Sequence, residues 1–119
     1  MNLLDLILRP LRTPRVTTRY PIEADLPNRG RRGTPVLSPA GCDDDRACVD
    51  ICPTAAIQVI EQGATKRIWK LDYGACIFCG ACIETCPNQA ITASNAFELA
   101  GRKREDLVAS YELGGADDG

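Results

Sequence analysis

The stretch that decides the fold is CIFCGACIETCPNQAI, residues 76–91, in which four cysteines are followed by a proline. The two-residue gaps between the first three cysteines let one tight loop wrap three corners of an iron–sulfur cubane, with backbone N–H groups directed at the sulfides. The fourth cysteine opens a new segment that reaches a different cluster, and the proline redirects the chain. These positions are Cys76, Cys79, Cys82, Cys86 and Pro87.

The same pattern occurs 34 residues earlier in the chain. Residues 41–59, GCDDDRACVDICPTAAIQV, align with residues 75–93, ACIFCGACIETCPNQAITA, without a gap. This constant register predicts two equivalent half-units. The aligned pairs are Cys42 with Cys76, Cys48 with Cys82, Cys52 with Cys86, Pro53 with Pro87, Ala56 with Ala90 and Ile57 with Ile91.

Two iron–sulfur clusters are predicted, because in the bacterial ferredoxin pattern the last cysteine of each run ligates the other cluster. The two halves would therefore exchange one thiolate each. One [4Fe-4S] cluster is expected on Cys52, Cys76, Cys79 and Cys82. The other cluster is expected on Cys42, Cys48 and Cys86.

Asp45 occupies the position that Cys79 has in the second half, so one corner of the first site lacks a thiolate. Three outcomes are open: Asp45 ligates the fourth iron of a [4Fe-4S] cluster through oxygen, the site holds a [3Fe-4S] cluster, or Asp45 is a loop residue beside a labile iron. An oxygen ligand binds iron less well than thiolate at a soft site, so we expect this corner to be lost easily. Asp43, Asp44 and Asp45 add negative charge, which disfavours adding an electron, whereas exposure and hydrogen bonds to sulfide act in the opposite direction.

The cysteines have two other interpretations, structural zinc and redox-inert clusters. Four-cysteine sites with C-x2-C spacing also bind structural zinc, but they rarely use three consecutive cysteine steps with a terminal C-P. Clusters can also be redox-inert and serve as the missing core. The apolar residues near the cysteines are expected to be buried and to exclude water: Ile57, Ile77, Phe78, Ile83 and Ile91.

The composition limits the other classes of function. The chain has 119 residues, of which 45% are hydrophobic and 25% charged, as in one small globular domain. It has no histidine, which excludes imidazole as a base or metal ligand. Aromatic residues make up only 5%, so something other than large rings must fill the core. Seven cysteines, an odd number with ligand spacing, favour a reducing, cytoplasmic compartment.

The N-terminal part differs in charge and pattern from the rest. Residues 1–33 carry seven arginines against three acids, whereas residues 34–119 carry seven basic against thirteen acidic residues. Leucine and isoleucine at helical spacing in residues 3–11 predict a short amphipathic helix ending near Pro10, too short to span a bilayer. It packs on its own domain or docks on a membrane or partner. Residues 12–41 contain five prolines and three glycines, which predicts an extended arm without regular structure.

The predicted fold is α+β. Residues 58–60 and 67–71 predict strands around a turn at Gln62 and Gly63, and residues 97–110 predict a helix interrupted at Gly101. We expect a pseudo-two-fold, dicluster bacterial-ferredoxin-like domain at residues 40–94. An N-terminal helix and extended docking arm at residues 1–39 would precede it, and a C-terminal helix and tail at residues 95–119 would follow.

CIFCGACIETCPNQAI resembles the two-cluster ferredoxin-like subunit of respiratory complex I and of membrane-bound nickel-iron hydrogenases, including formate hydrogenlyase. The resemblance extends to VTTRYP (16–21), the arginine and glycine stretch 29–33 and FELAGRKREDL (97–107), the last being closer to the hydrogenase branch. It implies a peripheral, non-catalytic subunit on the cytoplasmic side of the membrane. That subunit would relay single electrons towards a small subunit beside the catalytic site. Asp45 stands where the family usually has cysteine.

The partners that the resemblance implies are the small and large subunits of a hydrogenase or complex I-like assembly, an electron-donating iron–sulfur subunit and membrane subunits. The basic arm and the helix would clamp onto these neighbours and the membrane surface. Neither nucleic acid nor a small-molecule substrate is expected, because the body of the chain is acidic and no residue is placed for bond chemistry. The alternatives are a freely diffusing ferredoxin carrier and a structural or regulatory metal-binding module.

Overall fold

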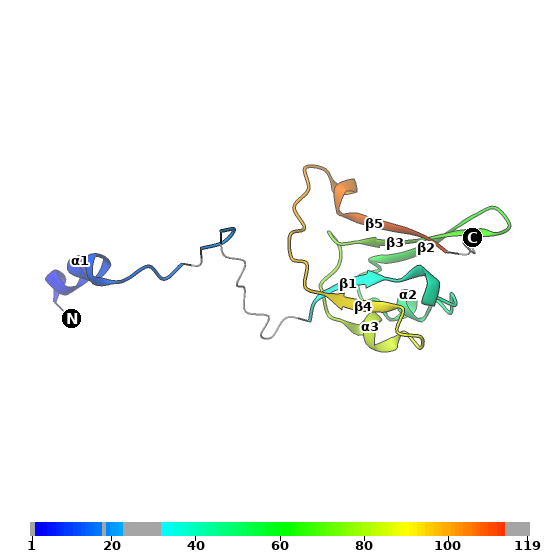
Figure 1. The fold of residues 1–119 in the computed structure, drawn as a ribbon, viewed down its shortest axis with the longest axis horizontal. Coiled ribbons are helices and arrows are strands. Elements are labelled where there is room, and N and C mark those ends of the chain that lie inside the picture. The colour runs from blue at the N-terminus through cyan, green and yellow to red at the C-terminus, as the bar shows by residue number, and fades with distance from the viewer. Residues whose placement is uncertain (1, 18, 23–31, 114–119) are drawn as a thin grey trace.

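The computed structural model describes residues 2–17, 19–22 and 32–113 (Figure 1). Within these residues it has helices, strands and two short 3-10 helices, η1 and η2. In chain order they are α1 (Leu3–Arg12), β1 (Thr34–Leu37), η1 (Pro39–Gly41), α2 (Ala47–Ile51), β2 (Ile57–Gln62), β3 (Lys66–Asp72), α3 (Ala81–Thr85), β4 (Ile91–Ser94), η2 (Arg104–Leu107) and β5 (Val108–Leu113). The small mixed fold of helices and sheets is therefore as expected.

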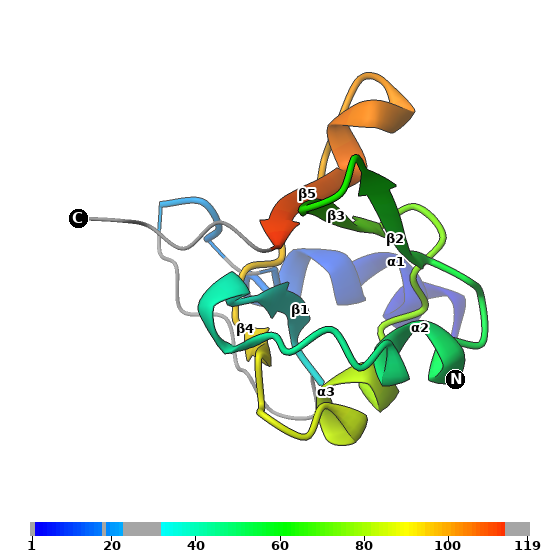
Figure 2. The same cartoon turned by 90° about the vertical axis from the view of Figure 1, so that its right-hand side faces the viewer.

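The strands form two small antiparallel sheets, which Figure 2 shows beside the helix pair α2 and α3. β1 pairs with β4, and β3 lies between β2 and β5. In the first sheet Leu37 faces Ile91, and in the second Leu71 faces Ile57. The strands predicted at 58–60 and 67–71 are confirmed, and Gly63 in the turn between them has a φ of 75°, which favours glycine.

The core is narrow and contains cysteine side chains. Its largest fully buried members are Trp69, Ile57, Leu71 and Ile91. Two cysteines and two alanines join them at 9% exposure or less: Cys48, Cys82, Ala56 and Ala90. The core therefore lies where the inner faces of the strands meet the two short helices.

The expectation that residues 12–41 lack regular structure is wrong for residues 34–37, which form β1. Thr34 is 2% exposed, and its hydroxyl donates a hydrogen bond of 2.5 Å to the carbonyl of Ala96. Pro35 is tolerated because β1 lies at the edge of its two-stranded sheet, and its carbonyl accepts a 2.8 Å bond from the Tyr73 hydroxyl. The ferredoxin-like body therefore includes residues before position 40.

The C-terminal helix predicted at 97–110 is also wrong. The carboxylate of Asp106 accepts the backbone N–H groups of Arg102 and Lys103 at 2.9 and 3.1 Å, which fixes a tight turn instead of a helix. The chain then runs through η2 into β5, which pairs with β3 along its length. Pairing with a sheet edge and burial of Leu113 outweigh the local helical pattern. The predicted tail 114–119 and the stretch 29–31 lie outside the described residues.

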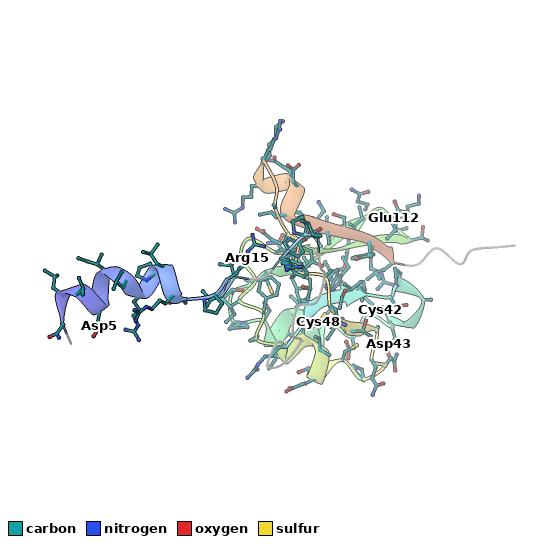
Figure 3. The ribbon with its side chains drawn as sticks, turned by 60° about the vertical axis from the view of Figure 1, so that its left-hand side comes forward. Asp5, Arg15, Cys42, Asp43, Cys48 and Glu112 are labelled. Atoms are coloured by element: carbon teal, nitrogen blue, oxygen red, sulfur yellow. The ribbon has the colours of Figure 1, made fainter. Side chains whose placement is uncertain are left out.

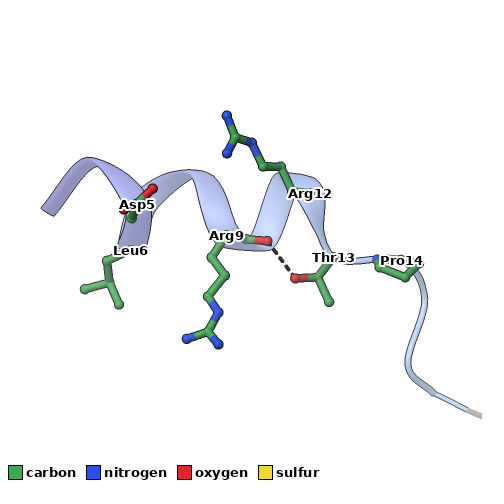
Figure 4. A pocket seen from close by; sticks show the side chains of 6 residues that line it. All are labelled: Asp5, Leu6, Arg9, Arg12, Thr13 and Pro14. Carbon is green, nitrogen blue, oxygen red and sulfur yellow. Dashed lines mark hydrogen bonds between the residues drawn. The ribbon is translucent and has the colours of Figure 1, made fainter. Parts of the chain in front are cut away.

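Helix α1 extends two residues past Pro10, to Arg12. The Thr13 hydroxyl donates a 2.7 Å hydrogen bond to the carbonyl of Arg9 and closes the helix end, where a shallow hollow faces solvent (Figure 4). None of the residues of α1 is buried, and Figure 1 shows the helix apart from the two sheets. Across the described residues, no helix has the length and apolar character needed to cross a bilayer.

The position of β5 gives a stability test. Replacing Leu113 by alanine removes a side chain that is 4% exposed, and we expect it to cost about 2–5 kcal/mol of the free energy of unfolding. The neighbouring Glu112→Ala, at an exposed position of the same strand, should change it by about 0.5 kcal/mol or less. Anaerobic denaturation followed by circular dichroism measures both. Equal, small effects would mean that this strand does not pack on the core.

Candidate iron–sulfur centres

Two cysteine loops lead into the short helices α2 and α3. The residues before the helices, Arg46 and Gly80, are both left-handed, with φ of 60° and 80°. Asp44 and Phe78, two residues earlier in each loop, are left-handed as well. Alternation of right- and left-handed residues makes a concave turn whose N–H groups point inward and bind anions. The loops are therefore shaped to hold a negatively charged group.

The first cavity lies between β1, β2, β3 and the loop before α3. Its cysteine lining comes from both halves of the repeat, because one of the four thiols precedes β2 and the other three belong to residues 76–82. The cysteines are Cys52, Cys76, Cys79 and Cys82.

The second cavity lies beside the loop before α2. Its walls carry three cysteines and the acidic loop at residues 43–45. Strands β1, β2, β3 and β4 each add one apolar side chain. Figure 3 shows Cys42, Cys48 and Asp43 in the body of the molecule, whereas Asp5 lies on α1. The thiol and carboxylate residues of this cavity are Cys42, Cys48, Cys86, Asp43, Asp44 and Asp45.

Backbone N–H groups point at three of the sulfur atoms. Ala56 donates to Cys52 Sγ and Ala90 to Cys86 Sγ, each at 3.3 Å, and Phe78 N lies 3.4 Å from Cys76 Sγ. The bonds to Cys52 and Cys86 join residues that are equivalent under the 34-residue shift. Both halves therefore orient their last cysteine in the same way. Such donors stabilise thiolate over thiol.

The electrostatics of the cavities oppose free thiolates. Burial raises the pKa of Cys42, Cys48 and Cys76, and burial together with neighbouring thiols raises the pKa of Cys82 to about 11. Cys52 differs, because the hydrogen bonds from residues 54, 56 and 57 outweigh burial and lower its pKa. Buried sulfurs of this kind ionise readily only beside a cationic centre, so the donor set fits iron–sulfur clusters.

Asp44 and Asp45, in the loop before α2, have different surroundings. The side chain of Asp44 is 9% exposed and forms an ion pair with Arg67. Asp45 is exposed, and its Oδ1 accepts the Ala47 N–H at 3.2 Å. The left-handed Arg46 is held by Glu61, with 2.6 Å between Nη2 and Oε1. Asp45 therefore stands at the rim of its cavity, bonded to the start of α2.

The apolar shell expected around the cysteines is found in part. Ile57 and Ile91 are each 2% exposed, and Phe78 and Ile83 are half-buried. Ile77 was expected to be buried but is 62% exposed, because it stands in the loop before α3 and is not among the residues packed on the core. Water is therefore excluded mainly from the strand side of the cavities.

Two residues of the site were missed by the sequence analysis. Trp69 is 1% exposed and lines the cavity of Cys42, although it stands in a strand far from the cysteine motif. Arg32 donates a 2.5 Å hydrogen bond to the carbonyl of Cys79 and so supports the second cysteine loop. Only the pairing of β1 and β3 with their neighbours brings these side chains to the cysteines.

Comparison with known proteins matches residues 40–90 to the family model of the 4Fe-4S dicluster domain. NADH-quinone oxidoreductase subunit I 2 of Geobacter metallireducens is 35% identical over 117 residues, covering 91% of this chain and 89% of that protein. Formate hydrogenlyase subunit 6 of Escherichia coli is 37% identical over 103 residues, covering 86% of this chain and 57% of that protein.

Among solved structures, a chain of the membrane-bound sulfane sulfur reductase, an archaeal respiratory membrane complex, superimposes with a TM-score of 0.65 at 29% identity. The match covers 90% of this chain and 58% of that one. The chain thus spans most of the Geobacter relative but less than two thirds of the other two. The family resemblance that the sequence indicated is confirmed.

The two arginine–acid pairs of this site differ in burial and give a matched test. Arg67→Gln leaves the largely buried Asp44 carboxylate without its cation, which should cost about 1–3 kcal/mol of unfolding free energy. Arg46→Gln breaks a pair whose side chains are 46% and 64% exposed, which should cost about 1 kcal/mol or less. Anaerobic thermal melts of the two variants compare them directly, and an equal loss in both would contradict this ranking.

Proposed function

This chain belongs to the family of iron–sulfur subunits that includes NADH-quinone oxidoreductase subunit I and formate hydrogenlyase subunit 6, and we propose that it relays single electrons inside a membrane-associated oxidoreductase complex. The observation that carries the proposal is the pair of cavities, each of which is lined by cysteines from both halves of the repeat. The chain is a non-catalytic part of that assembly, and substrate chemistry belongs to other subunits.

The residues that would hold the two clusters follow from the cavity linings. Cys52, Cys76, Cys79 and Cys82 would bind one [4Fe-4S] cluster. Cys42, Cys48 and Cys86 would bind the second, with Asp45 or an open corner completing it. When bound, such clusters take up and release one electron at a time. The crossed cysteines, Cys52 and Cys86, are each fixed by an N–H···S bond of 3.3 Å.

We infer a pseudo-two-fold relation between the halves from their shared register. The strand pairs Leu37–Ile91 and Leu71–Ile57 exchange under the 34-residue shift, as do helices α2 and α3. Cys48 and Cys82 lie on these packed helices in one buried core, and the charge of Cys48 contributes to the raised pKa of Cys82. The two sites are therefore neighbours, as a two-step electron path requires.

The N-terminal segment is the part we assign to docking. Its helix exposes five large apolar side chains by 52–81%, which an isolated soluble carrier would hide: Leu3, Leu4, Leu6, Ile7 and Leu11. Arg9 and Arg12 stand in its last turn. We assign the chain to the cytoplasmic side of the membrane, in contact with hydrogenase or complex I-like small and large subunits, an electron-donating iron–sulfur subunit and membrane subunits.

The relay function is tested by purification from native membranes. A tagged chain, isolated anaerobically after mild detergent extraction, should retain membrane subunits and carry iron and acid-labile sulfide without zinc. A version lacking residues 1–22 should keep its iron and sulfide but lose the membrane subunits. A full-length chain that is a soluble monomer and exchanges electrons with soluble reductases at full rate would make it a free ferredoxin instead.

The Asp45 corner gives a second test of the assignment. We expect mild oxidation to remove iron from the site of Cys42, Cys48 and Cys86, because an exposed carboxylate bonded to Ala47 N–H is a weak ligand beside three thiolates. Asp45→Cys should then retain its four irons. The reciprocal variant Cys79→Asp should make the other site equally labile. EPR of the oxidised proteins measures both, and a stable four-iron cluster in the unchanged chain would rule out the labile corner.

A further inference from the structure

Trp69 has a buried donor that nothing in the fold uses. The residue lies in β3, the central strand of its sheet, and is 1% exposed. In the described part of the chain its Nε1 is the one buried side-chain nitrogen or oxygen without a hydrogen-bond partner. An unpaired buried N–H costs free energy, so native proteins almost always provide an acceptor. The acceptor must therefore come from the space that the ring borders.

The ring is fixed in place from both sides. Trp69 pairs with Val59 of β2 and with Tyr111 of β5, and the Tyr111 ring packs on it with centroids 5.8 Å apart. The indole borders the cavity of Cys42, Cys48 and Cys86. The unused N–H therefore belongs to a ring that lines the sulfur-containing cavity.

The other cavity has no such donor at the equivalent place. The 34-residue shift that relates Leu37 to Leu71 makes Pro35 the equivalent of Trp69 in the other half. Pro35 lines the cavity of Cys52 and Cys76. Proline has neither a side-chain nor a backbone N–H. The two otherwise parallel sites thus differ by one hydrogen-bond donor at the strand wall, in addition to the exchange of Cys79 for Asp45.

We propose that the Trp69 indole N–H donates a hydrogen bond to a sulfur atom in the Cys42, Cys48 and Cys86 site and raises the reduction potential of that site alone. The inference rests on the proposed function, because it requires a cluster in this cavity. Reduction adds one negative charge to the cluster, and a donor dipole aimed at sulfur stabilises the more negative state. Trp69 would thereby offset the negative charge of Asp43 and Asp45. It is a tuning residue and not a ligand.

Trp69→Phe keeps an aromatic ring in the core and removes only the indole N–H and part of the ring. Redox titration followed by EPR should show that, at a fixed solution potential, the ratio of reduced to oxidised cluster at this site falls by up to about tenfold, equivalent to about 59 mV for one electron. The ratio at the site of Cys52 should not change. Tyr111→Phe is the matched control, since it alters the neighbouring ring but leaves the indole, and it should leave both ratios unchanged.

A second measurement needs no variant in the core. Trp69 is the single tryptophan of the chain, so growth with ¹⁵N-indole-labelled tryptophan marks this nitrogen alone. Pulsed EPR should detect ¹⁵N coupling on the signal of the Asp45-side cluster, identified as the one that Asp45→Cys alters, and not on the other signal. A purely structural role for Trp69 would give no such coupling.

The outcomes separate this inference from the proposed function. Two clusters with an unchanged ratio in Trp69→Phe and no ¹⁵N coupling would overturn the role of Trp69 and leave the relay function intact. A chain without iron and sulfide would overturn the relay function itself. If Trp69→Phe does not fold, the labelled unchanged chain still decides, because presence or absence of the ¹⁵N coupling supports or refutes the hydrogen bond.

Discussion

The constraint on which the structure depends is the burial of sulfur. In a chain with few large rings, cysteine side chains take the place of part of an ordinary core. Burial raises the pKa of four of them, Cys42, Cys48, Cys76 and Cys82. Apolar contacts alone do not stabilise such groups as thiolates. Backbone N–H groups from tight turns and cationic centres in the cavities do. The left-handed residues Arg46 and Gly80, which turn the two loops inward, are explained by this requirement.

The sequence predicted those parts of the fold whose causes are local. The cysteine spacing and the shift of 34 residues located both loops, and the Gly63 turn located the β2–β3 hairpin. It failed for β1 and β5, because each pairs with a strand more than 35 residues away and only that partner makes its residues strand-like. The helix expected at 97–110 does not form, because the Asp106 carboxylate closes a turn by accepting the N–H groups of nearby residues.

The candidate site shows the same division. All proposed ligand positions line one of two cavities, and their binding of clusters stays a prediction from the motif spacing. Trp69 and Arg32 could not be assigned to the site, since their contacts arise from strand register and from the path of the arm. The charge of the acidic loop was also overestimated from sequence, because Arg67, 23 residues from Asp44, pairs with it in the folded chain.

The duplication explains how two neighbouring sites can differ without altering the frame that holds them. Both halves keep the helix, the alanine N–H donor and the crossing cysteine, so their geometry is shared. The positions that differ between the halves and line the cavities include Asp45 for Cys79, Arg46 for Gly80 and Trp69 for Pro35. Ligand identity, nearby charge and hydrogen bonds to sulfur are the factors that set cluster potentials. Divergence at such positions would give the two proposed sites unequal potentials, so that the proposed relay would favour one order of electron occupancy.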